Sequence, residues 1–141
     1  MVDWSDVAGN PIYLISLLGV SSTGGDVADM IKALVAANVT EVSKIHMIGF
    51  SLGAHIAGKA GSLLSPKVAR ITGLDATGIG YDPTRLDNWL DKSDAQFVDS
   101  IHTCGGSLGY SERYAHMDFY PNNGIPIQPN CTTVLSPSEG I

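Results

Sequence analysis

Residues 45–58 read Ile-His-Met-Ile-Gly-Phe-Ser-Leu-Gly-Ala-His-Ile-Ala-Gly, an apolar run followed by a series of small residues. Positions 49–53 match the pattern G-x-S-x-G, in which a serine stands at a sharp turn between a strand and a helix. The apolar run predicts a strand at 44–49, and the residues that follow predict a helix over about 52–64. Glycines on both sides of the serine let the strand and helix backbones pass closely. The stretch therefore predicts a strand–turn–helix unit with Ser51 at the turn.

The segments on both sides of this unit alternate between helix and strand. Residues 21–26 offer several N-caps, and apolar residues recur at helical spacing from 27 to 35, so a helix is expected to follow the caps and to end near Asn38. The order helix, strand, helix, strand is typical of βαβ units. The expected fold class is therefore α/β, with a mostly parallel sheet and flanking helices. Further strands are expected at 68–74, 97–103 and 117–120, and loops at 76–92 and 121–141.

Ser51 is the candidate nucleophile of this unit. In the strand–turn–helix arrangement its hydroxyl projects from the sheet, where it can attack a carbonyl carbon. The backbone N–H of Leu52 would sit at the helix N-terminus, where N–H groups lack intrahelical acceptors and the helix dipole favours negative charge. Leu52 is therefore a candidate for half of an oxyanion hole. The alternative is a Ser-Gly turn that only caps a helix of small residues.

Asp75 is the candidate acid. It stands at the C-terminal end of the strand that follows the serine's strand, which is where the acid comes in the chain order of α/β-hydrolases. Parallel α/β sheets collect their active groups at these strand ends. The alternative is an aspartate that caps a turn.

The histidine base is harder to assign, because it must follow the acid and reach the serine hydroxyl at about 2.6–3.2 Å. His46 lies in the serine's own strand and His55 one turn past the serine, so both are expected to be packing or capping residues. His102 and His116 follow the acid but lie beside apolar segments, where a histidine is most often structural. On the residues alone, His102 and His116 stay as candidates.

The composition is that of a globular chain with a formal net charge of −6. Such an acidic chain is a poor candidate for binding nucleic acid, and it has no polybasic tract for an anionic membrane. No secretory signal is visible at Met1, and no apolar run of about 18 residues predicts a transmembrane helix. Glycosylation sequons begin at Asn38 and Asn130, as in secreted proteins. Cys104 and Cys131 are interpreted either as buried thiols or as disulfide-forming cysteines of a secreted protein.

Beyond the G-x-S-x-G motif, the sequence resembles the pancreatic lipase family, which includes lipoprotein lipase, triacylglycerol lipases and the phospholipases A1 of animals and wasp venoms. The matching segments follow the family's order and spacing across nearly the whole chain, which is far more specific than the motif alone. They are VDWS at 2–5, IHMIGFSLGAHIAG at 45–58, RITGLD at 70–75, SDAQFVDSIHT at 93–103, and HMDFYPNN at 116–123 with QP at 128–129.

The resemblance implies an α/β-hydrolase fold with Ser51 as nucleophile and Asp75 as acid. In the family the histidine base lies downstream of the segment that matches 128–131, in a Cys-x-His context, so no histidine of this chain is the expected base. Residues 1–141 are thus expected to form part of a lipase catalytic domain, truncated at both ends and inactive alone. The implied reaction is hydrolysis of a lipid ester, either triacylglycerol or the sn-1 ester of a phospholipid. It would take place at a lipid–water interface, in a secreted protein that requires no cofactor.

The resemblance also suggests a structural calcium ion, which some family members hold in the loop after the acid. Asp91 and Asp94 are the implied ligands, since carboxylates three residues apart suit a hard cation. The alternative is two solvated acids. In the family the Cys131 position pairs with a cysteine downstream, and a Cys104–Cys131 bridge is the other option.

Three positions depart from the family pattern: Phe50 replaces a common histidine, Ala76-Thr77 replaces Pro-Ala, and Cys104 replaces a frequent aspartate. The rival from another functional class is a non-catalytic lipid-binding or yolk-type relative, but such proteins typically lack the serine. An unrelated hydrolase is disfavoured by the downstream matches.

Overall fold

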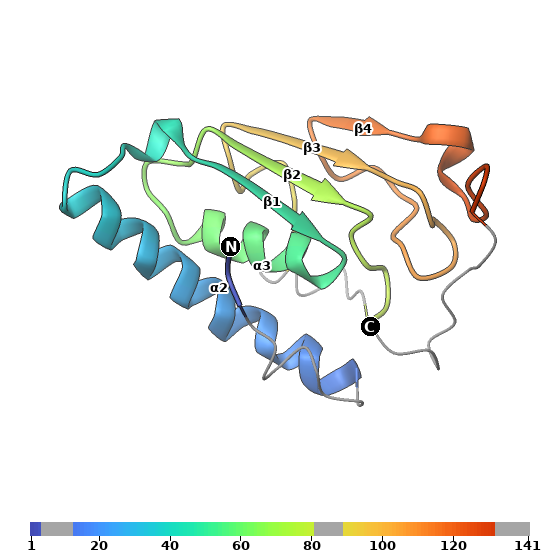
Figure 1. Cartoon of the computed structure of the whole chain (residues 1–141), viewed down its shortest axis with the longest axis horizontal. Coiled ribbons are helices and arrows are strands. Elements are labelled where there is room, and N and C mark those ends of the chain that lie inside the picture. The colour runs from blue at the N-terminus through green and yellow to red at the C-terminus, as the bar shows by residue number, and fades with distance from the viewer. Residues whose placement is uncertain (4–12, 81–88, 132–141) are drawn as a thin grey trace.

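The computed structural model describes residues 1–3, 13–80 and 89–131 of the chain. In these ranges a four-stranded sheet with the order β1-β2-β3-β4 is accompanied by two α-helices (Figure 1). The parallel sheet with its helices confirms the expected α/β class and matches a partial α/β-hydrolase fold. The elements are α2 (Tyr13–Ala36), η1 (Val42–Lys44), β1 (His46–Phe50), α3 (Leu52–Ser62), β2 (Arg70–Leu74), β3 (Phe97–Ile101), β4 (Met117–Phe119) and η3 (Pro121–Gly124).

Every pair of neighbouring strands in this sheet is parallel, so the C-terminal ends of the strands share one edge. Phe50 of β1 lies opposite Leu74 of β2, and Leu74 lies opposite Ile101 of β3. The residues that directly follow the first two strands, Ser51 and Asp75, therefore leave the sheet side by side. All four predicted strands are found, each within two residues of its expected bounds.

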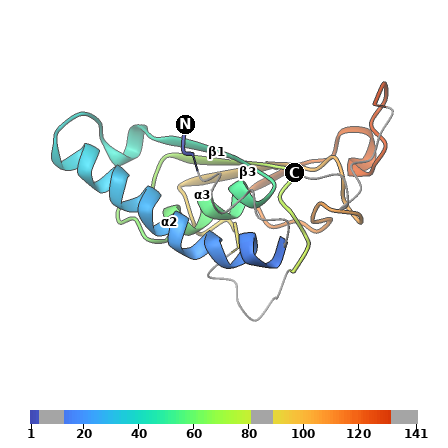
Figure 2. The ribbon, with the colours of Figure 1, turned by 60° about the horizontal axis from the view of Figure 1, so that its bottom comes forward.

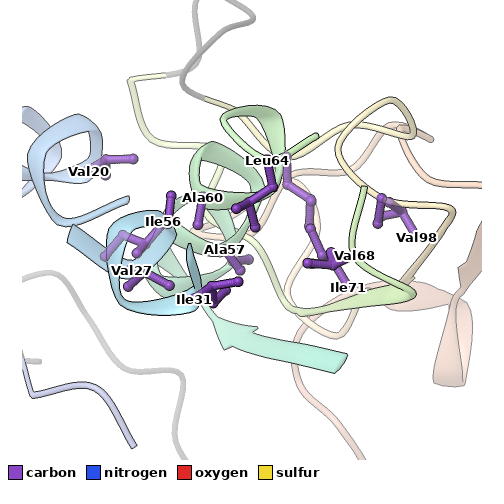
Figure 3. Close-up of a cluster of buried hydrophobic side chains, with 14 of the residues drawn as sticks. Val20, Val27, Ile31, Ile56, Ala57, Ala60, Leu64, Val68, Ile71 and Val98 are labelled. Atoms are coloured by element: carbon purple, nitrogen blue, oxygen red, sulfur yellow. The ribbon is translucent and has the colours of Figure 1, made fainter. Parts of the chain in front are cut away.

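The apolar core lies between α3 and the sheet and between α3 and α2. Helix α3 packs against β1 and β2, and α2 packs on α3 on the side away from the sheet (Figures 1 and 2). Figure 3 shows this layering, with side chains of α2 meeting those of α3 and those of α3 meeting the sheet. No helix in the described ranges has both the length and the apolar character needed to cross a membrane. Among the buried core residues are Val20, Val27, Ile31, Ile56, Ala57, Ala60, Leu64, Val68, Ile71 and Val98.

The predicted start of the first helix is wrong. Helix α2 begins at Tyr13, and residues 21–26, which were expected to cap it, lie inside it. A Cβ on Gly24 would lie 2.6 Å from the Cβ of Lys59, so the small residues of this segment let α2 approach α3 closely. Burial of α2 on α3 outweighs the poor helix propensity of Ser, Thr and Gly, because packing supplies most of the stability of a helix in a protein.

The end of α2 agrees with the prediction and is a Schellman motif. Asn38 has a φ of 55°, in the left-handed region. The Val39 N–H donates to Leu34 O at 3.0 Å and the Asn38 N–H donates to Val35 O at 3.0 Å, the two hydrogen bonds that define this motif. Asparagine tolerates the left-handed conformation better than most residues, so it ends the helix here.

Candidate active site at the C-terminal edge of the sheet

Ser51 occupies the turn between β1 and α3, as the motif predicts. Its φ and ψ are 53° and −121°, a sparsely populated combination of the kind found at functional turns. Its backbone N–H donates to Leu74 O at 2.9 Å, which ties the turn to the end of β2. The Ser51 side chain makes no capping hydrogen bond to α3. The structure thus differs from the simple helix cap that was the alternative interpretation.

Gly49, the first glycine of the motif, lies where β1 and α3 approach most closely. A Cβ at this position would lie 2.2 Å from Gly53 O and 2.6 Å from the Ala54 Cα, distances that real Cβ atoms do not adopt. The glycine is therefore a steric requirement of the turn. A Cβ on Gly53, by contrast, would meet no heavy atom within 4 Å, so this side of the helix is open.

We expect Gly49→Ala to lower the free energy of unfolding of the full-length protein by about 3 kcal/mol or more, because the methyl group would meet backbone atoms that cannot yield without moving α3. Urea denaturation monitored by circular dichroism measures the change. Gly53→Ala is the matched control and should be neutral or stabilise by up to about 1 kcal/mol, since alanine favours a helix. Equal destabilisation by the two substitutions would contradict this explanation.

The Leu52 N–H lies at the N-terminus of the 11-residue helix α3, as expected. N–H groups of a first helical turn have no intrahelical acceptor, and the helix dipole adds positive potential there. Leu52 directly follows Ser51, so its N–H is close in the chain to the serine that would attack a carbonyl. The position suits one donor of an oxyanion hole.

Asp75 directly follows β2 and also has a left-handed φ, of 47°. Its carboxylate is held by backbone groups of the segment after β3: Oδ1 accepts the N–H of Thr103 at 2.9 Å and that of Cys104 at 2.9 Å. Both hydrogen bonds from the described residues go to Oδ1, which leaves Oδ2 for another donor. A carboxylate fixed through one oxygen is well arranged to orient an imidazole N–H with the other.

Gly109 closes the other side of this carboxylate, a feature that the sequence did not predict. A Cβ on Gly109 would lie 2.8 Å from Asp75 Oδ1. Two backbone hydrogen bonds hold the segment in place, from Tyr110 N–H to Ala76 O and from Gly78 N–H to Leu108 O, each at 2.8 Å. The only signal in the sequence is a glycine in a polar loop, and such residues are too common to point to a site.

His55 connects α3 to the loop that follows Asp75. Its ring is buried, and Nε2 lies 2.9 Å from Thr77 O while Nδ1 accepts the Leu90 N–H at 3.1 Å. These partners determine the neutral tautomer with hydrogen on Nε2, because Nδ1 must accept. The Trp89 ring packs edge-on at a centroid distance of 4.4 Å. Burial lowers the pKa of His55 to about 4.

We expect His55→Phe to lower the free energy of unfolding at pH 7 by about 3 kcal/mol, since it removes the buried hydrogen bonds of Nε2 with Thr77 O and of the Leu90 N–H with Nδ1. His55 has a lower pKa in the folded state than in the unfolded state, so its contribution is full above pH 6.5 and is lost as the pH falls toward 4. The stability gap between wild type and variant should shrink by about 3 kcal/mol over that range.

Urea titrations of both proteins between pH 4 and pH 7 measure this gap. Asp94 has the opposite dependence, because burial raises its pKa to about 7, but it is present in both proteins and cancels in the difference. A gap that is independent of pH would contradict the assignment of a neutral, buried His55.

The other three histidines also have structural partners. His102 is buried with Asp118 and stacks on Tyr120 at a centroid distance of 4.4 Å. Within the described part of the chain, no histidine is hydrogen-bonded to Ser51. The ring hydrogen bonds of these histidines include His46 Nε2 to Thr72 Oγ1 at 2.8 Å, His102 Nε2 to Asp118 Oδ1 at 2.8 Å, and the Val98 N–H to His116 Nδ1 at 3.0 Å. His102 Nδ1 also lies 2.8 Å from Tyr110 O.

Asp91 and Asp94, the predicted calcium ligands, form a tight turn in which each carboxylate accepts a backbone N–H. Asp94 Oδ2 accepts the Asp91 N–H at 2.9 Å, and Asp91 Oδ1 accepts the Ser93 N–H at 2.5 Å. Among the described residues no three His, Cys, Asp or Glu side chains are grouped as a metal would require. The two carboxylates thus stabilise the turn through hydrogen bonds without an ion, and the calcium site stays a prediction.

Cys104 and Cys131 are both free thiols, so the bridge between them that was one option is not formed. Cys104 is half-buried beside the Asp75 carboxylate, whereas Cys131 is exposed. Pairing of Cys131 with a cysteine outside the 141 residues stays a prediction.

The sequence was compared with a family model and with known proteins. A family model described as Lipase matches residues 1–139. The chain is 44% identical over 138 residues to Lipase member H of Rattus norvegicus, covering 96% of the chain and 30% of the relative. It is 40% identical over 138 residues to hepatic triacylglycerol lipase of Homo sapiens, covering 93% of the chain and 27% of the relative. The chain thus spans less than a third of the length of these relatives.

Proposed function

The chain belongs to the lipase family, and from this premise we propose that the full-length protein hydrolyses carboxylic esters of lipids with Ser51 as the nucleophile. The observation that carries the proposal is the position of Ser51. It stands at a strained turn between strand and helix. Its backbone N–H donates a hydrogen bond to the carbonyl oxygen of Leu74, and Leu74 directly precedes Asp75. Nucleophile and acid therefore start from neighbouring strand ends at one edge of the sheet.

The proposed reaction has two halves. The Ser51 hydroxyl attacks the ester carbonyl carbon while an imidazole takes its proton, and the tetrahedral oxyanion is stabilised by the Leu52 N–H and a second donor. The C–O bond to the alcohol then breaks, and the imidazolium protonates the leaving alcohol. Water attacks the acyl-enzyme by the same route and releases the fatty acid, which restores the serine.

Asp75 would orient the imidazole through Oδ2, because Oδ1 is held by two backbone N–H groups. None of the four histidines of the chain suits the role of base, since each is held by partners other than Ser51. We assign the base to a histidine of the full-length protein outside these 141 residues. The 141-residue chain alone should therefore not turn over lipid esters.

The proposed substrates are neutral or phospholipid acyl esters at a lipid–water interface. Triacylglycerol is the substrate in the name of hepatic triacylglycerol lipase, at 40% identity, and the sn-1 ester of a phospholipid offers the same reacting carbonyl. The chemistry requires no cofactor, because serine, imidazole and carboxylate supply the nucleophile and the proton transfers. We also propose a secreted location for the full-length protein, as the resemblance to the lipase family implies.

Labelling of the full-length protein with a fluorophosphonate tests the proposal, because this reagent reacts with an activated serine. Mass spectrometry should find the adduct on the peptide that contains Ser51. Fatty acid release from a triolein emulsion and from phosphatidylcholine vesicles then separates the two substrate classes. A full-length protein that neither reacts with the reagent nor releases fatty acid would favour the non-catalytic lipid-binding alternative.

A further inference from the structure

The turn between α2 and β1 carries the sequon Asn38-Val39-Thr40, which the proposed reaction does not use. Asn38 and Val39 are exposed, Val39 to 68%, and the sequon lies just past the last turn of α2. Among the described residues the Asn38 amide group makes no side-chain hydrogen bond, so its Nδ2 is available to a modifying enzyme. We infer that Asn38 carries an N-linked glycan in the full-length protein.

The backbone conformation accounts for an asparagine at position 38, but no contact in the described part of the chain accounts for a threonine at position 40, and this difference supports the inference. Asn38 is suited to its left-handed φ of 55° at the end of a helix, whether or not it is modified. Within the described ranges the Thr40 hydroxyl, however, has only a 3.5 Å contact with Glu41 O, which is too long to contribute much. A hydroxyl two residues after asparagine is what the glycosylation sequon requires, so modification accounts for both residues.

The position of the turn is compatible with the proposed function. The strands are parallel, so the segment before β1 lies at the opposite edge of the sheet from Ser51 and Asp75 (Figure 1). A bulky hydrophilic glycan at Asn38 would leave the edge that must approach a lipid surface uncovered. This inference rests on the proposed secretion and is independent of the role of Ser51.

The second sequon, which begins at Asn130, is less suitable for a glycan. Asn130 is exposed, but nearby Gln128 donates through Nε2 to Thr103 O at 3.2 Å, and the Thr103 N–H binds the Asp75 carboxylate. A glycan at Asn130 would therefore stand close to the proposed catalytic edge. The third residue of that sequon lies outside the described ranges.

The modification is a group transfer from a lipid-pyrophosphate-linked oligosaccharide, the donor used in the secretory pathway. The Asn38 Nδ2 attacks the anomeric carbon of the first sugar and forms a C–N bond. The bond from that carbon to the pyrophosphate oxygen breaks, lipid pyrophosphate leaves with the electron pair, and Nδ2 loses one proton to the transferase. The product is an N-glycosylated asparagine.

The test uses the full-length protein secreted from a eukaryotic host, with peptide N-glycosidase digestion in heavy-oxygen water. Asn38 should be recovered as aspartate carrying the heavy isotope, and digestion should increase gel mobility. Thr40→Ala should abolish both signals while leaving Asn38 in its turn, and Thr40→Ser should keep them. The two variants should hydrolyse lipid esters at equal rates, because residue 40 lies far from the catalytic edge.

Secreted, active protein with unmodified Asn38 would overturn the inference, and so would a glycan found only at Asn130. Protein that is active but retained in the cytosol and unmodified would overturn it together with the proposed secretion. An inactive protein that carries the glycan at Asn38 would support the inference and contradict the proposed hydrolase function, so the two failures can be told apart. If Thr40→Ala were poorly secreted, Asn38→Gly provides a second variant, since glycine also suits this φ.

Discussion

Replacing Ser51 with alanine should lower kcat/KM for lipid ester hydrolysis by the full-length protein by about 10⁴- to 10⁶-fold. The variant lacks the atom that forms the acyl-enzyme, and only binding and oxyanion stabilisation would be left to assist water. The fold should persist, because the Ser51 side chain makes no capping hydrogen bond to α3 and the turn depends on backbone contacts. Initial rates of fatty acid release, together with loss of fluorophosphonate labelling, measure the effect.

Ser62→Ala is the matched control, since it removes a hydroxyl from the other end of α3. Ser62 is exposed, and its hydroxyl donates to Lys59 O at 2.8 Å within its own helix. Its rate should equal that of the wild type. Hydrolysis by Ser51→Ala within about tenfold of the wild type would remove Ser51 from the nucleophile's role, since a difference of one decade is far below the expected loss.

Asp75→Asn should lower kcat by about 10⁴-fold with little change in fold. The reason lies in the hydrogen bonds to Oδ1, which accepts the N–H groups of Thr103 and Cys104. The asparagine carbonyl oxygen must take this position, because an NH₂ group cannot accept. The amide NH₂ is then forced to the place of Oδ2, where it would donate to an imidazole nitrogen that must itself donate. The base would be held in the wrong tautomer.

Steady-state kinetics on an emulsified triacylglycerol measure this loss, and circular dichroism checks that the fold is retained. Asp29→Asn is a suitable control because Asp29 is exposed and, among the described residues, pairs only with Lys32 on the surface of α2. Its effect on the rate should be negligible, as for most surface ion pairs. Wild-type kcat in Asp75→Asn would show that the acid of the site is another residue.

Local patterns predicted the central part of the candidate site well. The serine, its turn and the exit helix depend on residues within one short segment, and Gly49 is required by contacts with the next turn of chain. The strand bounds were predictable for the same reason, since alternation and turn residues act over a few positions. The position of Asp75 followed from strand order, because parallel strands end at a common edge.

Contacts between distant segments were not predictable in this way. The start of α2 was placed too late, because residues 21–26 are poor helix formers until α3 covers them. The Asp75 carboxylate accepts N–H groups that lie 28 and 29 positions further along the chain. The His55 ring is hydrogen-bonded to groups in loops 22 and 35 positions further along. No periodicity along the chain encodes such pairs.

The sequence by itself thus determined the α/β class, the order of the strands and the turn that presents Ser51, because each of these depends on side-chain spacing over one strand or one helix. Only the tertiary structure decided where α2 begins, which oxygen of Asp75 is held, and that the histidines of the chain are bound to other groups. The physical reason is that hydrogen bonds and close packing between distant segments depend on positions in space, and these exist only after the sheet and helices have assembled.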